Sequence, residues 1–215
     1  MVFDTIGMVA TTSSRRRHGL PRAEQVARNR AELLAAAGRV FRQLGYAGAS
    51  LDAIAEAAGF SKGAVYSHFA SKADLFLSLL ESRIEERAEG QREALGRRGT
   101  LRSFIGQVFA TSRADPEWQL ALLEFRVVAA RDPELQARYR KVHERTVAGI
   151  ADALGTLLAS KDVEPVLPLD TLAVAGLICD VGARLEDLAI PGVVGDELPT
   201  ALFTRLLGAS EEESQ

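Results

Sequence analysis

Three short helical segments follow one another within residues 45–76, and each of them begins at a serine. The serines are Ser50, Ser61 and Ser71. A serine before a helix accepts a hydrogen bond from a free N–H group of the first turn, so each serine predicts a helix start. Between the first two segments, the small residues and glycine at positions 57–59 allow two short helices to cross steeply. This spacing predicts a helix-turn-helix.

The rest of the N-terminal third favours one long helix. Pro21 is the only proline before Pro116, and apolar residues recur at spacings of three and four from Val26 to Leu44. Such spacing places them on one helical face, and Gly45 is expected to end the helix. No run of alternating β-branched and aromatic residues indicates a strand. The fold class is therefore predicted to be all-α.

Further helices are predicted downstream. The tripeptides Asp-Pro-Glu at 115–117 and 132–134 each combine a capping acid, a proline and an acidic first turn. The second tripeptide starts a long helix that ends before Pro165. Two more helices are expected over about 169–189 and 196–207.

Composition narrows the class of protein. The 215 residues are 47% hydrophobic and 26% charged, which is an ordinary globular balance. No segment has the length of a membrane span or the pattern of a signal peptide, and we expect no membrane association. One cysteine, Cys179, excludes an internal disulfide and multi-cysteine metal sites, which favours a reducing cytoplasm. We expect neither a metal nor another cofactor.

The charge is distributed unevenly along the chain. The formal net charge is −3, but residues 1–76 hold ten lysines and arginines against six acids, whereas residues 77–215 hold sixteen against twenty-three. A basic binding module joined to an acidic body would give this difference.

The stretch from about Glu24 to Leu80 resembles the DNA-binding region of the TetR family of bacterial transcriptional regulators. The resemblance lies in LLAAAGRVFRQLGY, SLDAIAEAAGFSKGAVYSHF and SKADLF, in that order. It implies a three-helix helix-turn-helix domain over residues 23–72 and a larger helical ligand-binding and dimerisation domain over 73–208. A disordered basic arm (1–22) and an acidic tail (209–215) are expected to flank them.

The resemblance also implies a function. We expect a cytoplasmic homodimer that binds a pseudo-palindromic double-stranded operator and represses transcription until a small-molecule effector, not identifiable from the sequence, releases it. A transcriptional activator or a ligand-independent regulator of the same fold is the alternative. An all-α enzyme and a protein-binding adaptor are remote alternatives, because the three histidines are scattered and no catalytic motif is present.

The segment SKGAVYSHF matches the recognition helix of the family, and Val65 and Phe69 are expected to point inward. Ala64 replaces a common threonine, which removes one hydrogen bond to DNA. The resulting candidate DNA-binding residues are Ser50, Ser61, Lys62, Gly63, Ala64, Tyr66, Ser67, His68, Lys72 and, in a basic arm, Arg15, Arg16 and Arg17.

Alternative interpretations remain for several of these residues. Gly63 permits either close backbone approach to DNA or relief of internal packing. Tyr66 and His68 either face DNA or fill a small core, and the arginines at 15–17 are either a DNA-contacting arm or a solvated tail. The serines either bind phosphate at helix N-termini or only cap helices.

The sequence of the predicted ligand-binding domain, residues 73–208, indicates its functional residues less clearly. The candidate ligand-pocket residues are aromatic or apolar residues at helical spacings and polar residues among apolar neighbours: Phe104, Phe109, Trp118, Leu122, Phe125, Arg126, Tyr139, His143 and Asp180. The aromatic residues are equally compatible with an ordinary core. Asp180 and Arg184 lie four residues apart, so they could pair within the subunit, pair across a dimer or face a ligand.

A dimer interface is expected on the last two helices. Val174, Ile178 and Leu185 form a stripe of large residues, beside which small residues allow a second helix to approach closely. The candidate interface residues are Ala175, Gly176, Cys179, Gly182, Ala183, Leu202, Phe203 and Leu206. Cys179 is interpreted as a small buried residue rather than a redox sensor.

Overall fold

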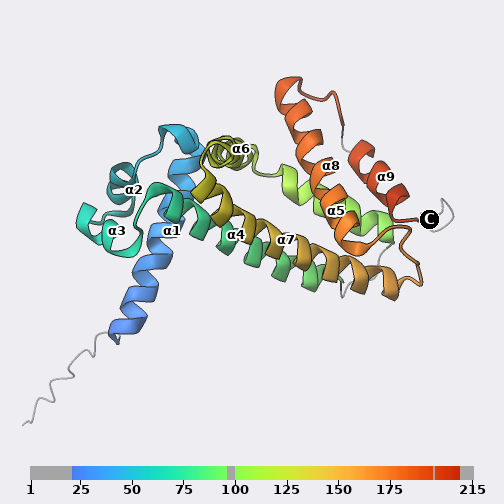
Figure 1. The fold of residues 1–215 in the computed structure, drawn as a ribbon, viewed down its shortest axis with the longest axis horizontal. Coiled ribbons are helices and arrows are strands. Elements are labelled where there is room, and N and C mark those ends of the chain that lie inside the picture. Colours follow the sequence, from blue (N-terminus) through green and yellow to red (C-terminus); the bar gives the residue numbers. More distant parts are fainter. Residues whose placement is uncertain (1–20, 96–99, 196, 209–215) are drawn as a thin grey trace, which may run out of the picture.

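A computed structural model of the chain describes residues 21–95, 100–195 and 197–208. Every regular element in these residues is an α-helix, as the sequence predicts (Figure 1). The helices are α1 (Arg22–Gly48), α2 (Leu51–Ala58), α3 (Lys62–His68), α4 (Lys72–Leu95), α5 (Leu101–Arg113), α6 (Pro116–Arg131), α7 (Pro133–Ser160), α8 (Leu169–Ala189) and α9 (Glu197–Leu206). Residues 1–20 of the predicted basic arm and the predicted acidic tail lie outside the described residues, whereas Arg22 begins α1.

The helices form an elongated molecule. Figure 1 shows α1, α2 and α3 at one end and α5, α8 and α9 at the other. The long helices α4 and α7 pack against each other and connect the two ends. Helix α6 packs mainly on α1, so it joins the body to the N-terminal helices.

Local sequence signals account for the helix starts. The side chains of Ser50, Ser61 and Ser71 accept hydrogen bonds from the backbone N–H groups of the residues three positions later. Asp115 and Asp132 cap α6 and α7 in the same way, each followed by a proline in the first turn. These five predicted starts are confirmed.

Gly45 kinks α1 rather than ending it, which corrects the predicted helix end. Its φ of 69° and ψ of 177° are not helical, and the helical path resumes to Gly48. A Cβ at position 45 would lie 2.7 Å from the Glu124 carboxylate oxygens, and Glu124 Oε2 accepts a hydrogen bond of 2.8 Å from the Ala47 N–H. Only glycine fits this close approach and this φ. A residue of α6 thus holds the end of α1.

The buried side chains form two apolar clusters. The first, here called the N-terminal core, combines side chains of α1, α2, α3 and α6 with those of the first turns of α4 and of α7. Aromatic rings form its centre. Phe76 is fully buried and contacts four rings, with centroids 4.9 Å from Phe41, 5.1 Å from Tyr46, 5.1 Å from Trp118 and 4.5 Å from Phe125. The N-terminal core therefore extends past residue 72 and includes part of the body.

The second cluster, here called the C-terminal core, joins α5, the later turns of α7, α8 and α9. It consists mainly of leucines: Leu101, Ile105, Phe109, Leu154, Leu157, Leu158, Leu172, Ala173, Phe203 and Leu207. Within the described residues of this cluster, the rings of Phe109 and Phe203 contact each other, with centroids 5.9 Å apart.

Candidate nucleic-acid interface

Helices α2 and α3 meet at a tight turn. Gly59 ends α2 with a left-handed φ of 71°, and the N–H of Phe60 donates to the Ala55 carbonyl at 2.9 Å. This is a glycine-terminated helix end, and the pairing satisfies carbonyls that the helix leaves free. Ser61 then caps α3, so only residues 59–61 separate the two helices.

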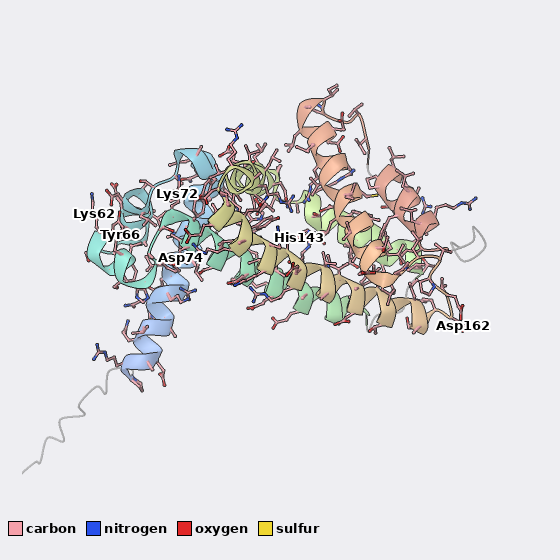
Figure 2. All side chains as sticks on the ribbon, in the orientation of Figure 1. Lys62, Tyr66, Lys72, Asp74, His143 and Asp162 are labelled. Carbon is pink, nitrogen blue, oxygen red and sulfur yellow. The ribbon has the colours of Figure 1, made fainter. Side chains whose placement is uncertain are left out.

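Two buried side chains anchor α3 on the N-terminal core. Val65 is 0% exposed and Phe69 is 1% exposed. Because these residues are four positions apart, they fix which face of the helix points away. The side chains of Lys62, Tyr66 and Ser67 lie on the exposed side, and Tyr66 is 56% exposed. Figure 2 shows Lys62 and Tyr66 at the end of the molecule farthest from the body.

The structure decides two of the alternatives left open by the sequence. A Cβ at Gly63 would meet no atom within 4 Å, so this glycine relieves no packing within the subunit. Tyr66 is exposed and His68 is half-buried, with its ring 6.3 Å from the Phe69 ring, so neither fills a core. The outward face of α3 is thus available to a partner.

Lys62 carries the positive charge of this face. Its ammonium lies 2.5 Å from the Asp52 carboxylate of α2, and this hydrogen bond raises the pKa of Lys62. The pair is exposed, with 69% of the lysine side chain accessible. An exposed pair of this kind is weak and exchanges readily for another anion.

Lys72 lies at the start of α4 as expected, but its ammonium points into the fold. It donates hydrogen bonds to the carbonyl oxygens of Tyr46 at 2.7 Å and Ala49 at 2.8 Å, and it lies 4.6 Å from the Tyr46 ring centre. Burial lowers the pKa of Lys72. In this structure Lys72 therefore holds the end of α1 rather than presenting a charge at the surface.

Two arginines of α1 adjoin the helix-turn-helix and were not among the predicted site residues. Arg39 donates to the Ala57 carbonyl at 3.4 Å, and the Arg30 guanidinium lies 4.6 Å from the Phe69 ring centre. Both belong to the polar face of α1. In the sequence, only their position on that face set these two arginines apart. Solvent-exposed arginines occupy the same face, so the position alone does not indicate a site residue.

The candidate pocket residues of the body do not converge on one cavity. Trp118, Leu122 and Phe125 are buried in the N-terminal core, and Tyr139 packs against it. Phe104 and Phe109 belong to the other side, in or against the C-terminal core. A groove of about 390 Å³ between α5 and α9 includes Phe109, Arg102 and Glu197 in its lining, but of the predicted pocket residues only Phe109 lies there.

The polar residues of the body form two bonded groups, one around Asp180 and one around Arg126. Ser112 Oγ donates to Asp180 Oδ2 at 2.8 Å, and Arg184 forms an ion pair with Asp180 and also bonds to Ser112. Arg126 Nε donates to the Tyr139 hydroxyl at 2.8 Å. Arg87 and Arg126 lie within electrostatic range of Arg184, and His143 within that of Arg126. We use the name polar layer for these six residues: Arg87, Ser112, Arg126, His143, Asp180 and Arg184. Arg87 and Ser112 were missed because their sequence surroundings look like ordinary helix surface.

Three of the predicted interface residues on α8, Ala175, Gly176 and Cys179, pack within the subunit. Gly176 packs inside the subunit, where an added Cβ would lie 2.9 Å from the Phe203 ring, and Phe203 is only 4% exposed. Ala175 and Cys179 pack against the C-terminal core. Of the predicted interface residues, Leu202 and Leu206 are 52% and 38% exposed, and Gly182 is also exposed.

The large residues of α8 take the exposed side instead. Val174 is 39% exposed, Ile178 66% and Leu185 38%. The reason is steric: the small side chains let α9 approach α8 closely, so the bulky stripe turns outward.

Two further findings concern other kinds of site. No helix in the described residues is long and apolar enough to cross a membrane. Within the same part of the chain, no group of three or more His, Cys, Asp or Glu side chains could hold a metal ion.

Comparison with known proteins identifies the family. Residues 33–79 match the family of bacterial regulatory proteins of the tetR type, and residues 97–176 match the C-terminal domain of BetI-type transcriptional repressors. The chain is 32% identical to the transcriptional regulator CymR of Pseudomonas putida over 163 residues, which cover 72% of this chain and 80% of CymR. It is also 32% identical to the transcriptional activator FasR of Mycolicibacterium smegmatis over 145 residues, 66% of this chain and 64% of FasR.

A solved structure shares the fold. A transcriptional regulator from Saccharomonospora viridis in complex with choline superposes with a TM-score of 0.65 at 18% identity, covering 86% of this chain and 97% of that one. The helix-turn-helix with an outward α3, joined to a helical body, thus defines a DNA-binding transcriptional regulator rather than an enzyme. The chain belongs to the TetR family.

Proposed function

We propose that the protein is a homodimeric repressor that binds a pseudo-palindromic operator through α3 and leaves it when a small molecule binds the body. The outward face of α3, held by Val65 and Phe69, is the observation that carries this proposal. Two such helices in a dimer would read half-sites about one helical turn apart. Bacterial operator DNA is cytoplasmic, so we also propose that location.

The proposed DNA contacts follow from exposure. Lys62, Tyr66 and Ser67 would reach base edges and phosphates, while Gly63 lets the backbone approach the duplex. Ser50 and Ser61, at the starts of α2 and α3, would lie near the phosphates. Lys72 would act indirectly, because its ammonium positions the end of α1.

Dimerisation is proposed through α8 and α9. The exposed large residues of the two helices, Val174, Ile178, Leu198 and Leu202 among them, form an apolar surface that suits a second copy of the same surface. Release would then follow if the effector favours a different separation of the two α3 helices.

Fluorescence anisotropy with the DNA upstream of the protein's own gene tests the proposal. Tyr66→Ala should weaken binding by about tenfold or more, and Lys62→Ala should weaken it and reduce the salt dependence by about one phosphate contact. Lys141→Ala, an exposed lysine of α7, is the matched control. Equal effects of the two lysine variants would remove α3 from the interface. A reporter assay separates the alternatives, because loss of a repressor raises transcription and loss of an activator lowers it.

A further inference from the structure

An ion pair joins the first turns of α2 and α3. Asp52 lies two residues after the serine that caps α2, and Lys62 directly follows the serine that caps α3. The Lys62 ammonium lies 2.5 Å from Asp52 Oδ2, and both side chains are accessible, 69% for the lysine and 48% for the aspartate. Lys62 lies at the end of the molecule farthest from the body (Figure 2). The Asp52 carboxylate is therefore beside the surface that would meet DNA.

The fold depends little on this pair. Two exposed charges stay hydrated and are screened by salt, so their attraction stabilises a protein only slightly. The position of α3 is fixed by the buried Val65 and Phe69, and α2 is anchored by the buried Leu51 and Ile54. An acid in the first turn also suits the dipole of α2, which leaves Asp52 one structural role to be tested.

The helix-turn-helix carries little positive charge of its own. Residues 50–69 hold one lysine, Lys62, and no arginine, against the two acids Asp52 and Glu56, so their formal charge is −1 with histidine neutral. The ammonium of Lys72, at the start of α4, points into the fold. Phosphate contacts require surface cations. The partner of Lys62 thus has a large influence on how this unit meets DNA.

A DNA phosphate and the Asp52 carboxylate are partners of the same kind for Lys62. Both are oxyanions that accept hydrogen bonds from an ammonium group. When the ammonium turns to a phosphate, it leaves the carboxylate without its cation beside the negative DNA backbone. Loss of the pair and the new repulsion both weaken binding. Since every duplex carries phosphates, these costs apply to any DNA sequence.

We propose that Asp52 limits the affinity of the protein for DNA by competing with the phosphates for Lys62. This inference rests on the proposed function, which places the outward face of α3 on the DNA. Its consequence is regulatory. An effector changes the affinity for DNA by a limited factor, typically about 5- to 150-fold, so a protein that binds less tightly is released more completely.

Fluorescence anisotropy of Asp52→Asn tests the proposal with two duplexes of equal length, the DNA upstream of the protein's own gene and an unrelated sequence. Asparagine keeps the size of the side chain and removes its charge. An exposed pair holds the lysine back by about threefold, so a dimer that binds with both subunits should bind each duplex about tenfold more tightly. The gain should shrink as salt is added, because salt also screens the competing pair.

Three results of this measurement would overturn the proposal. Unchanged affinity for both duplexes would show that Asp52 does not compete. A gain with only one of the duplexes would show that the effect depends on base sequence. Weaker binding of the upstream DNA would make Asp52 a base contact, because a carboxylate can accept a hydrogen bond from cytosine.

Two controls separate competition for Lys62 from a general effect of charge. Glu56→Gln removes the same charge one turn further along α2, where the exposed carboxylate has no ion-pair partner within the described residues, and it should give a much smaller gain. An equal gain there would refute the competition. In a Lys62→Ala background, Asp52→Asn should also give little gain, because the contested lysine is absent. A full gain in that background would show that Asp52 repels DNA directly.

Thermal unfolding of the same proteins tests the structural role of Asp52. The Tm of Asp52→Asn should change by about 2 °C or less, because the pair is exposed. A larger loss of Tm without a gain in affinity would assign Asp52 to the start of α2 and overturn the proposal. Failure of the natural protein to bind the upstream DNA selectively refutes the proposed function. If the natural protein binds that DNA and Asp52→Asn shows no gain, only this inference falls.

Discussion

The two apolar cores differ in how they are built. In the N-terminal core, aromatic rings from α1, α4, α6 and α7 contact one another directly, with Phe76 at the centre. The C-terminal core is filled mainly by leucines and leaves large apolar residues of α8 and α9 exposed. The rings meet edge to face or stacked, which are the orientations that aromatic pairs prefer, whereas leucine contacts have no such preferred orientation. We therefore expect the N-terminal core to be the more rigid of the two.

One side chain ties the body to the DNA-binding end. Asp115 caps α6 and bonds to Arg42 of α1 and to Arg83 of α4, at 2.9 and 2.6 Å. Movement of α4 or α6 would therefore be transmitted to α1. Four experiments test the difference between the two cores and the connection between the two ends, and the first has the largest expected effect.

Phe76→Ala should lower the free energy of unfolding by about 5 kcal/mol, the upper part of the range for buried phenylalanines, because Phe76 contacts four rings. Phe203→Ala in the C-terminal core should cost about 3 kcal/mol, because Phe203 contacts one ring. Urea unfolding measures both values. A larger loss for Phe203→Ala would contradict the difference in rigidity.

Ile178→Glu should convert the dimer to monomers in sedimentation velocity and weaken operator binding by about tenfold or more, because a charge would enter the proposed interface. The stability of the subunit itself should change by only about 0.5 kcal/mol, since Ile178 is exposed there. Val128→Glu, at an exposed apolar position of α6, is the matched control. A dimer that persists in Ile178→Glu would place the interface elsewhere.

Asp115→Asn should cost about 2 kcal/mol, because the Arg42 and Arg83 guanidinium groups lose their shared carboxylate. Burial alone would raise the pKa of Asp115, but the hydrogen bonds from Arg83 and Arg42 outweigh it and hold that pKa below its ordinary value. A carboxyl with a lowered pKa stabilises the fold above the ordinary value of about 4, and this stabilisation is lost as the pH falls through the folded-state pKa.

The measurement for Asp115 is urea unfolding at several pH values. The stability difference between the natural protein and Asp115→Asn should be full near neutrality and should shrink in acid. A difference that stays constant down to low pH would show that the carboxylate charge has no part in the effect.

His143→Gln should have the smallest effect, confined to the pH dependence of stability. Burial and the neighbouring Arg126 lower the pKa of His143. The folded state then holds fewer protons than the unfolded state, so stability declines as the pH falls below the ordinary value of about 6.5. The variant should lose this part of the slope between neutrality and mild acid, whereas the control His68→Gln should keep it. If stability depends on pH in the same way in His143→Gln as in the natural protein, protonation of His143 does not contribute to that dependence.

Many of the helix starts, and the orientation of α3, were predictable because their signals are local. A serine or aspartate cap, a proline in the first turn and a glycine after the last one act within a few residues, so the starts of α2, α3, α4, α6 and α7 follow directly from the sequence. The four-residue spacing of Val65 and Phe69 likewise determined which face of α3 points outward. The family resemblance rests on the same segment.

The body was decided by contacts between residues far apart in the chain. Helix α8 carries both a bulky stripe and a small one, and periodicity alone does not determine which is buried. The choice was made by Phe203, whose ring packs on Gly176 from another helix. Similarly, nothing near Lys72 or Arg87 in the sequence indicates that one holds the end of α1 and the other joins the polar layer.

The sequence by itself thus determined the all-helical fold class, the starts of five helices and the outward face of α3, because these depend on interactions within a few residues. The tertiary structure alone decided the role of the aromatic residues, the exposed side of α8 and the bonding of Ser112 to Asp180 and Arg184, because packing and burial depend on which helices lie side by side.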